Sequence, residues 1–135
     1  MIFRFKIGRK KSGEYKLTKV FGFLDSIVTI PSKATSISSR CFNELCKFVT
    51  EVNFLPDSKL TEIYKSAFIG LPLLKQIRLP DSLEFLDPLA FDGSYIEEVE
   101  MTREIFNSVD LIVYNTCIKR IIDSKTKELL YCDEW

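Results

Sequence analysis

Residues 60–80, LTEIYKSAFIGLPLLKQIRLP, carry a pattern that recurs on both sides of this stretch. Each copy has a proline, an apolar residue, a small residue followed by Phe, and a triplet spaced apolar-x-x-apolar-x-apolar. The three copies are Pro31, Ile37, Cys41-Phe42, Val49, Val52, Phe54; then Pro56, Ile63, Ala67-Phe68, Leu74, Ile77, Leu79; then Pro80, Leu86, Ala90-Phe91, Ile96, Val99, Met101. The prolines are 25 and 24 residues apart. A fixed period in the twenties is typical of repeat proteins.

The triplet in each copy predicts a short strand with one buried face. Ile77 and Leu79 are two residues apart, so a strand points both side chains to the core and Arg78 to the other side. The Ala-Phe pair suits a short helical turn, where Ala permits close approach and Phe fills the layer behind. Because one copy alone cannot bury its apolar face, the pattern predicts stacked copies with an internal ladder of Phe rings.

Residues 79–101, LPDSLEFLDPLAFDGSYIEEVEM, resemble the BspA-type leucine-rich repeat, whose pattern is roughly IPxSVxxIGxxAFxxCxxLxxIxI. Residues 58–80 are similar, whereas residues 30–54 depart more, with Cys41 in place of Ala and extra residues before Val49. The resemblance covers roughly residues 27–101. It implies an α+β repeat solenoid, a short right-handed array of stacked strands and short helical turns. It also implies protein binding and, in secreted bacterial and protist members, surface adhesion.

The length predicts one domain over residues 1–135, with repeats in 27–101 between an N-terminal cap (1–26) and a C-terminal cap (102–135). Residues 1–20 read as a hairpin, because Phe3, Phe5 and Ile7 alternate with charged residues before a Gly-rich turn. The basic run at residues 9–11 in that turn predicts either a solvated turn or a phosphate-binding or nuclear-import patch.

The period breaks after Met101, and Leu111 with Val113 indicates one more strand. Residues 117–132 then read as a second hairpin that turns around residues 123–126. With the turn centred there, Cys117 lies opposite Cys132, close enough for a disulfide in an oxidising compartment and two thiols in a reducing one. Gly70 and Gly93 each follow a Phe by two residues, where a short helical turn can end.

The composition argues against several classes of function. Lys+Arg and Asp+Glu are both 19, so the basic surplus of a duplex nucleic-acid binder is missing and nucleic acid is not an expected partner. The chain has no His and its four Cys form no CxxC pair, which argues against the usual zinc sites and the common catalytic pairs. We therefore expect no metal, no cofactor and no enzymatic activity.

The sequence predicts a cytoplasmic location. No apolar run approaches the roughly 18 residues of a membrane span, and charges interrupt every apolar run near the N-terminus, so no signal peptide is evident. The extracellular surface is the alternative that the resemblance implies.

The outward positions of the stacked strands predict a polar binding face, on which a basic spot (Lys75, Arg78) gives way to an acidic one (Glu97, Glu98, Glu100, Glu104). The candidate binding residues are Thr29, Glu51, Asn53, Lys75, Gln76, Arg78, Glu98 and Glu100. A solvated face that only keeps the protein soluble is the competing interpretation. The leading hypothesis is a scaffold that binds a protein or peptide. The alternatives are a surface adhesin and a structural, self-assembling protein whose homodimer contacts involve Phe23, Leu24 and Phe106.

Overall fold

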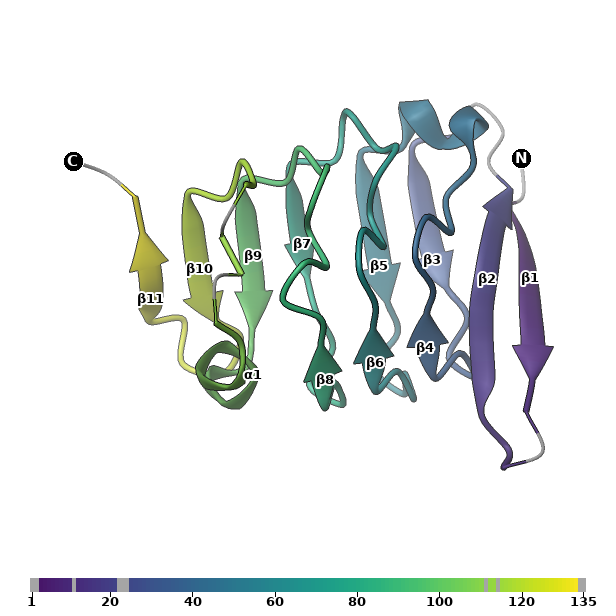
Figure 1. The fold of residues 1–135 in the computed structure, drawn as a ribbon, viewed down its shortest axis with the longest axis horizontal. Coiled ribbons are helices and arrows are strands. Elements are labelled where there is room, and N and C mark those ends of the chain that lie inside the picture. Colours follow the sequence, from purple (N-terminus) through teal and green to yellow (C-terminus); the bar gives the residue numbers. More distant parts are fainter. Residues whose placement is uncertain (1–2, 11, 22–24, 111, 114, 134–135) are drawn as a thin grey trace.

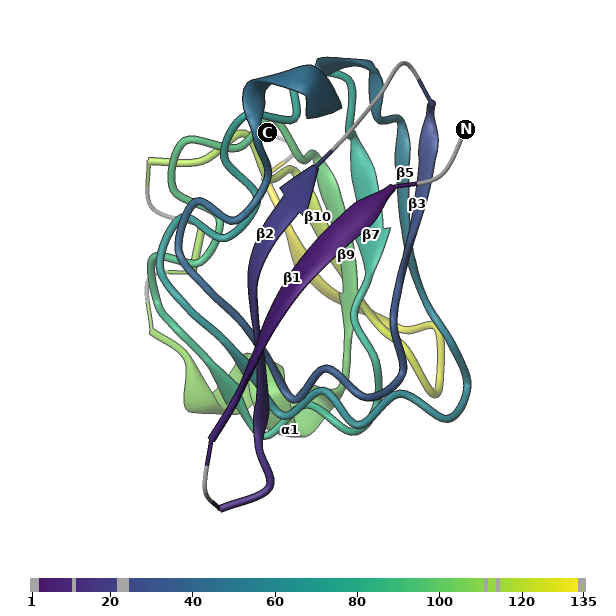
Figure 2. The same cartoon turned by 90° about the vertical axis from the view of Figure 1, so that its right-hand side faces the viewer.

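The computed structural model describes residues 3–10, 12–21, 25–110, 112–113 and 115–133. Short strands form two rows that face each other across a shared core (Figures 1 and 2). The first row is a five-stranded sheet of β1 (Arg4–Arg9), β2 (Tyr15–Phe21), β4 (Ser36–Ile37), β6 (Glu62–Ile63) and β8 (Phe85–Leu86). The second row contains β3 (Ile27–Ile30) paired with β5 (Glu51–Phe54), and a sheet of β7 (Gln76–Arg78), β9 (Glu98–Met101), β10 (Arg120–Asp123) and β11 (Leu129–Cys132).

Each repeat copy adds one strand to each row. In the first row Ile37 pairs with Ile63, and Ile63 with Leu86, all in parallel ladders. In the second row Val28 pairs with Val52, and Ile77 with Val99. Because these apolar residues share one register, their side chains point into one core, and each is at most 4% exposed. The spacing of the triplets therefore predicts correctly which side of each strand is buried.

The predicted ladder of Phe rings is present. The ring centroids of Phe42 and Phe68 are 6.2 Å apart, and those of Phe68 and Phe91 are 5.5 Å apart. Cys41 is fully buried at the position where the other copies have Ala, so it acts as a small apolar residue. The connecting segments are mostly hydrogen-bonded turns; the helices in the described residues are a 3₁₀ helix, η1 (Glu44–Phe48), and α1 (Arg103–Ser108).

The N-terminal hairpin is confirmed, and β1 pairs with β2 in an antiparallel ladder. The register shifts between Lys6 and Ile7, so Thr18 is an extra residue, and its hydroxyl donates to the carbonyl of Lys6 at 3.0 Å. This bulge lets Leu17 and Val20, three residues apart, both point into the core with no exposed surface.

The C-terminal part differs from the sequence prediction in two ways. Val113 lies in a turn, not in a strand, and Leu111 lies outside the described residues. The next strand is β10, which pairs in parallel with β9, so that Ile121 faces Val99 and the stack continues past Met101.

The second hairpin forms, but its predicted register is wrong. Cys132 faces Arg120, and Cys117 is an exposed free thiol outside the strands. The ladder with β9 fixes where β10 starts, because the amides of Lys119 and Arg120 both donate to the carbonyl of Glu97. The predicted pairing of Cys117 with Cys132 is therefore not formed, and both cysteines are free thiols.

Candidate interaction surface

All eight candidate binding residues lie on the outer side of the second row and are at least partly accessible to solvent. Thr29 is on β3, opposite Asn53 of β5. Gln76 and Arg78 are on β7, opposite Glu98 and Glu100 of β9, and Lys75 immediately precedes β7. The structure thus places these residues on one side of the second row.

This face is interrupted between β5 and β7, because no backbone ladder joins these two strands although both are fully described. At the start of other strands in the row, two successive amides donate to the carbonyl of the residue just before the preceding strand: Thr50 and Glu51 to Ser26, and Glu97 and Glu98 to Lys75. No such bond joins Gln76 to Thr50, although both residues are described. The backbone of Gln76 therefore faces an open seam.

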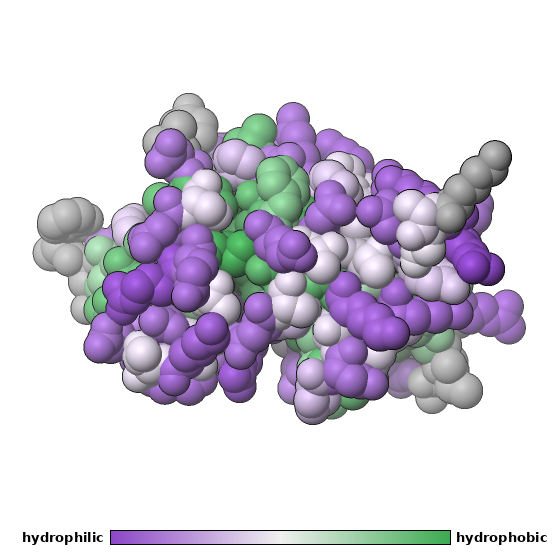
Figure 3. Space-filling model, turned by 90° about the horizontal axis from the view of Figure 1, so that it is seen from below, coloured by the Kyte–Doolittle hydropathy of each residue, from purple (hydrophilic) through white to green (hydrophobic). Residues whose placement is uncertain are grey.

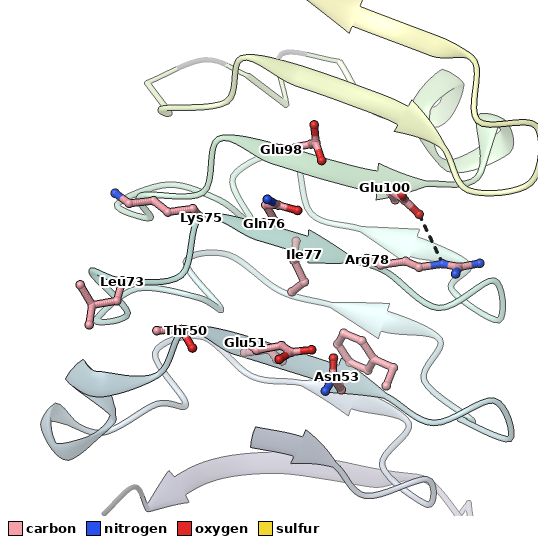
Figure 4. Close-up of a pocket in the computed structure, with 12 residues that line it drawn as sticks. Thr50, Glu51, Asn53, Leu73, Lys75, Gln76, Ile77, Arg78, Glu98 and Glu100 are labelled. Carbon is pink, nitrogen blue, oxygen red and sulfur yellow. Dashed lines mark ion pairs between the residues drawn. The ribbon is translucent and has the colours of Figure 1, made fainter. Parts of the chain in front are cut away.

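A cleft of about 440 Å³ lies over this seam (Figure 4). Its floor is apolar, with Val52 and Ile77 each 4% exposed, and Figure 4 shows the side chain of Ile77 directed from β7 towards β5. Seven of the eight candidate residues line the cleft, and the exception is Thr29. Exposed Leu73 closes one end.

A second hollow of about 390 Å³ continues the cleft along the same seam. Phe54 and Arg78 line both hollows. The second is bordered by the two Pro-Asp-Ser turns that follow β5 and β7, through Pro56, Ser58 and residues 80–82. Together the two hollows form one groove, which we call the β5–β7 groove. Sequence reasoning missed it, because the sequence pattern predicts an unbroken stack.

The charges on this face are less separated than the sequence suggests. Glu98 pairs with Arg120 of β10 at 3.3 Å, and Glu100 pairs with Arg78 at 3.4 Å and with Lys127 at 3.0 Å. The expected acidic spot is thus largely neutralised by the C-terminal hairpin. Glu51 has no ion pair with any described residue, and the Lys75 ammonium lies 5.5 Å from the centre of the Tyr95 ring. Glu51 and Lys75 are therefore the charges most available to a partner.

The sequence pattern of the BspA-type leucine-rich repeat region matches residues 22–130 in six copies. The chain belongs to the BspA-type leucine-rich repeat family. The family match reaches beyond the three copies recognised in the sequence and takes in β10, which agrees with the parallel pairing of β10 on β9. Proteins built from BspA-type repeats commonly serve in protein–protein interaction or adhesion.

No curated protein and no solved structure matches this BspA-type repeat chain. Across the described ranges, none of its helices combines the length and apolar character that crossing a membrane requires. In the same part of the chain, no three Cys, Asp or Glu side chains gather in a way that could hold a metal ion.

Proposed function

We propose that this chain is a non-enzymatic scaffold, a right-handed solenoid that binds an extended segment of a partner protein in the β5–β7 groove. The observation that supports this most is the break in the strand stack at the centre of the polar face. A continuous sheet would offer only side chains there. The seam adds an apolar floor and the backbone amide of Gln76.

The chemistry of the groove describes the segment it would accept. Val52, Ile77 and Leu73 suit an apolar side chain of the partner. Asn53 and Gln76 carry amides that can both donate to and accept from a peptide backbone. Glu51 on one wall and Lys75 on the other favour a partner that carries a charge on each side of its apolar anchor.

The shape of the groove favours an extended chain. The two hollows share Phe54 and Arg78 and follow the seam from Leu73 to the turns at residues 56–58 and 80–82. A peptide in extended conformation presents alternate side chains to a surface, so one set reaches the floor while the other remains in solvent.

The test selects displayed random peptides on the immobilised protein and measures each recovered peptide against three proteins. These are the wild type, a groove variant with Glu51→Lys and Lys75→Glu, and a control variant with Glu44→Lys and Lys65→Glu. Glu44 and Lys65 are also exposed, but they lie outside the groove. Both variants keep the net charge, so an effect of overall charge cancels.

We expect wild type and control to bind alike and the groove variant to bind at least about tenfold more weakly, a loss of about 1.4 kcal/mol. Equal binding by all three proteins would show that the peptides bind outside the groove. Charge reversal at Arg78, Glu98 or Glu100 is a poorer test, because it would also break ion pairs within the protein. The cytoplasmic location stays a prediction.

A further inference from the structure

The charges of this neutral chain are strongly segregated along its length. Residues 1–20 hold seven basic residues and one acidic residue, Glu14. Residues 81–110 hold nine acidic residues and one basic residue, Arg103. The first stretch contains the hairpin β1–β2 at one end of the stack, and the second spans β8, β9 and α1 towards the other end (Figure 1).

Most basic charges of the hairpin have no carboxylate partner among the described residues. Lys6 faces Lys19 directly across the ladder, and both side chains are exposed. Like charges in directly opposed positions destabilise a strand pair. Among the described residues, Arg4, Lys6 and Lys19 form no ion pair, and the hairpin's ion pair is Lys10 with Glu14 at 3.7 Å. This outer surface, with Arg4, Lys6, Lys19 and the exposed ring of Phe21, is called the basic edge below.

Several basic residues in the C-terminal half of the chain behave differently. Five of them near the C-terminal end each pair with at least one carboxylate within 4 Å: Arg78, Arg103, Lys119, Arg120 and Lys127. Exposed Lys59 and Lys65, between the two ends, also form no ion pair with a described residue, so the basic edge is distinguished by how its open cations cluster on one strand pair. An external anionic surface would remove the repulsion between Lys6 and Lys19.

Three uncompensated acidic residues lie around β8 and α1. Glu84, Glu104 and Asp110 are exposed and form no ion pair with any described residue. Phe85, which directly follows Glu84, and Leu89, in the segment after β8, are exposed apolar residues, at 42% and 36%. Figure 3 shows apolar side chains gathered between hydrophilic ones on the lower face, towards the C-terminal half. We call the set Glu84, Phe85, Leu89, Glu104 and Asp110 the acidic patch.

We propose that the basic edge of one copy docks on the acidic patch of a second copy of this chain. The two surfaces match in charge, and each adds an exposed aromatic ring, Phe21 on one side and Phe85 on the other. Because they are different surfaces, the contact is head-to-tail, and a dimer keeps one free basic edge and one free acidic patch, to which further copies can add. A zero net charge removes the overall repulsion between copies. The β5–β7 groove takes no part, so this proposal stands independently of the proposed function.

The test is sedimentation velocity at about 0.02 M and about 0.5 M salt, since screening between exposed charges is weak at the first and strong at the second. Three further proteins accompany the wild type: a basic-edge variant (Lys6→Glu, Lys19→Glu), an acidic-patch variant (Glu84→Lys, Glu104→Lys), and the control Glu44→Lys, Lys65→Glu. Thermal unfolding of each variant verifies that it folds.

We expect wild type and control to form dimers and larger species at low salt and to dissociate at high salt. Each surface variant alone should be monomeric. Mixed together they should associate again, because the basic-edge variant keeps its acidic patch, the other keeps its basic edge, and the two reversed surfaces are also opposite in charge. Mixing gives a result that misfolding of either variant cannot imitate.

The proposal is overturned if the wild type is monomeric at both salt concentrations, or if the two folded variants do not associate when mixed. Binding of monomeric wild type to polyuridylate or to phosphatidylserine vesicles, lost in the basic-edge variant, would also overturn it. That outcome would assign the basic edge to a phosphate-bearing partner.

Discussion

The ring of Phe68 stacks on the ring of Phe91 with 5.5 Å between centroids and 14° between planes. On its other side, Phe68 meets Phe42 at 6.2 Å and 31°. The tilted contact joins the first and second copies, whose strands β5 and β7 are also the ones that separate. The looser junction between these copies therefore extends from the core to the surface, where it forms the groove.

Replacing Phe68 with Ala should destabilise the protein strongly. Phe68 has no exposed surface and contacts Phe rings on both sides, so truncation leaves a cavity between two copies. We expect a loss of about 3–5 kcal/mol in the free energy of unfolding, measured by urea denaturation. Phe85→Ala is the matched control, because that ring is 42% exposed and should cost about 1 kcal/mol or less. Similar losses for both would mean that the ladder contributes no special packing.

Replacing Gly93 with Ala should cost more than replacing Gly70 with Ala. Both glycines have positive φ, +76° and +89°, so each substitution carries backbone strain of about 1 kcal/mol or more. At Gly93 the new Cβ would also lie 2.8 Å from Cδ1 of Ile69, whereas at Gly70 the nearest atom is 3.7 Å away. Pushing Ile69 off its rotamer adds about 0.5–1.5 kcal/mol. Equal losses in thermal or urea unfolding would show that Ile69 moves aside freely.

Stability should depend on pH through Asp123. Its carboxylate accepts the amides of Lys125 and Thr126 and lies 3.4 Å from Nε of Arg103. The bond from the Lys125 amide is the main cause that lowers its pKa in the folded state. A lowered pKa stabilises the fold above the unfolded pKa of about 3.9, and this contribution is lost as the pH falls through the folded pKa.

We therefore expect Asp123→Asn to be less stable than wild type at neutral pH, with a difference that shrinks below about pH 4. Urea denaturation at a series of pH values measures it. A difference that is the same at every pH would show that the charge of Asp123 is not what stabilises the turn.

The four thiols should react in two groups. Cys117 is exposed and Cys132 is half-buried, whereas Cys41 and Cys46 have no exposed surface. Burial, with a smaller contribution from neighbouring Cys46, raises the pKa of Cys41 to about 12. Iodoacetamide at about pH 8, followed by peptide mass spectrometry, should modify Cys117 and Cys132 in the native protein and Cys41 and Cys46 only in denaturant. Rapid native labelling of Cys41 would contradict the packing of the first copy.

The parts of the fold that follow a local period could be predicted from the sequence. The Phe residues of the ladder and the buried strand residues recur at spacings that can be read from the sequence. Ile63, Phe68 and Ile77 of the second copy are examples. The register of the C-terminal hairpin could not be predicted in the same way. It depends on the ladder between β9 and β10 and on the turn at Asp123. The spacing of Cys117 and Cys132 contains no information on either contact.

The face of the candidate site could be predicted, but the groove could not. Alternation along a strand places Gln76 and Arg78 outward, whereas a missing ladder depends on how two copies stack. One sequence feature accompanies the opening. Val52 and Ile77 are 25 residues apart, while Val28 and Val52 are 24 apart, and Ile77, Val99 and Ile121 follow at intervals of 22. The interval from Val52 to Ile77, which crosses the seam, is thus the longest of these. It includes Pro72, which cannot donate a backbone hydrogen bond.

Amide hydrogen exchange at Gln76 tests the central claim, the open seam, most directly. Gln76, Glu51 and Glu98 hold equivalent positions at the start of three strands. The amides of Glu51 and Glu98 each donate, at 3.1 Å, to the carbonyl of the residue just before the preceding strand. In the free protein we expect the Gln76 amide to exchange at least about tenfold faster than the other two, because it has no such acceptor. Protection of Gln76 equal to that of Glu98 would show that β5 and β7 pair in solution, and would contradict both the seam and the groove.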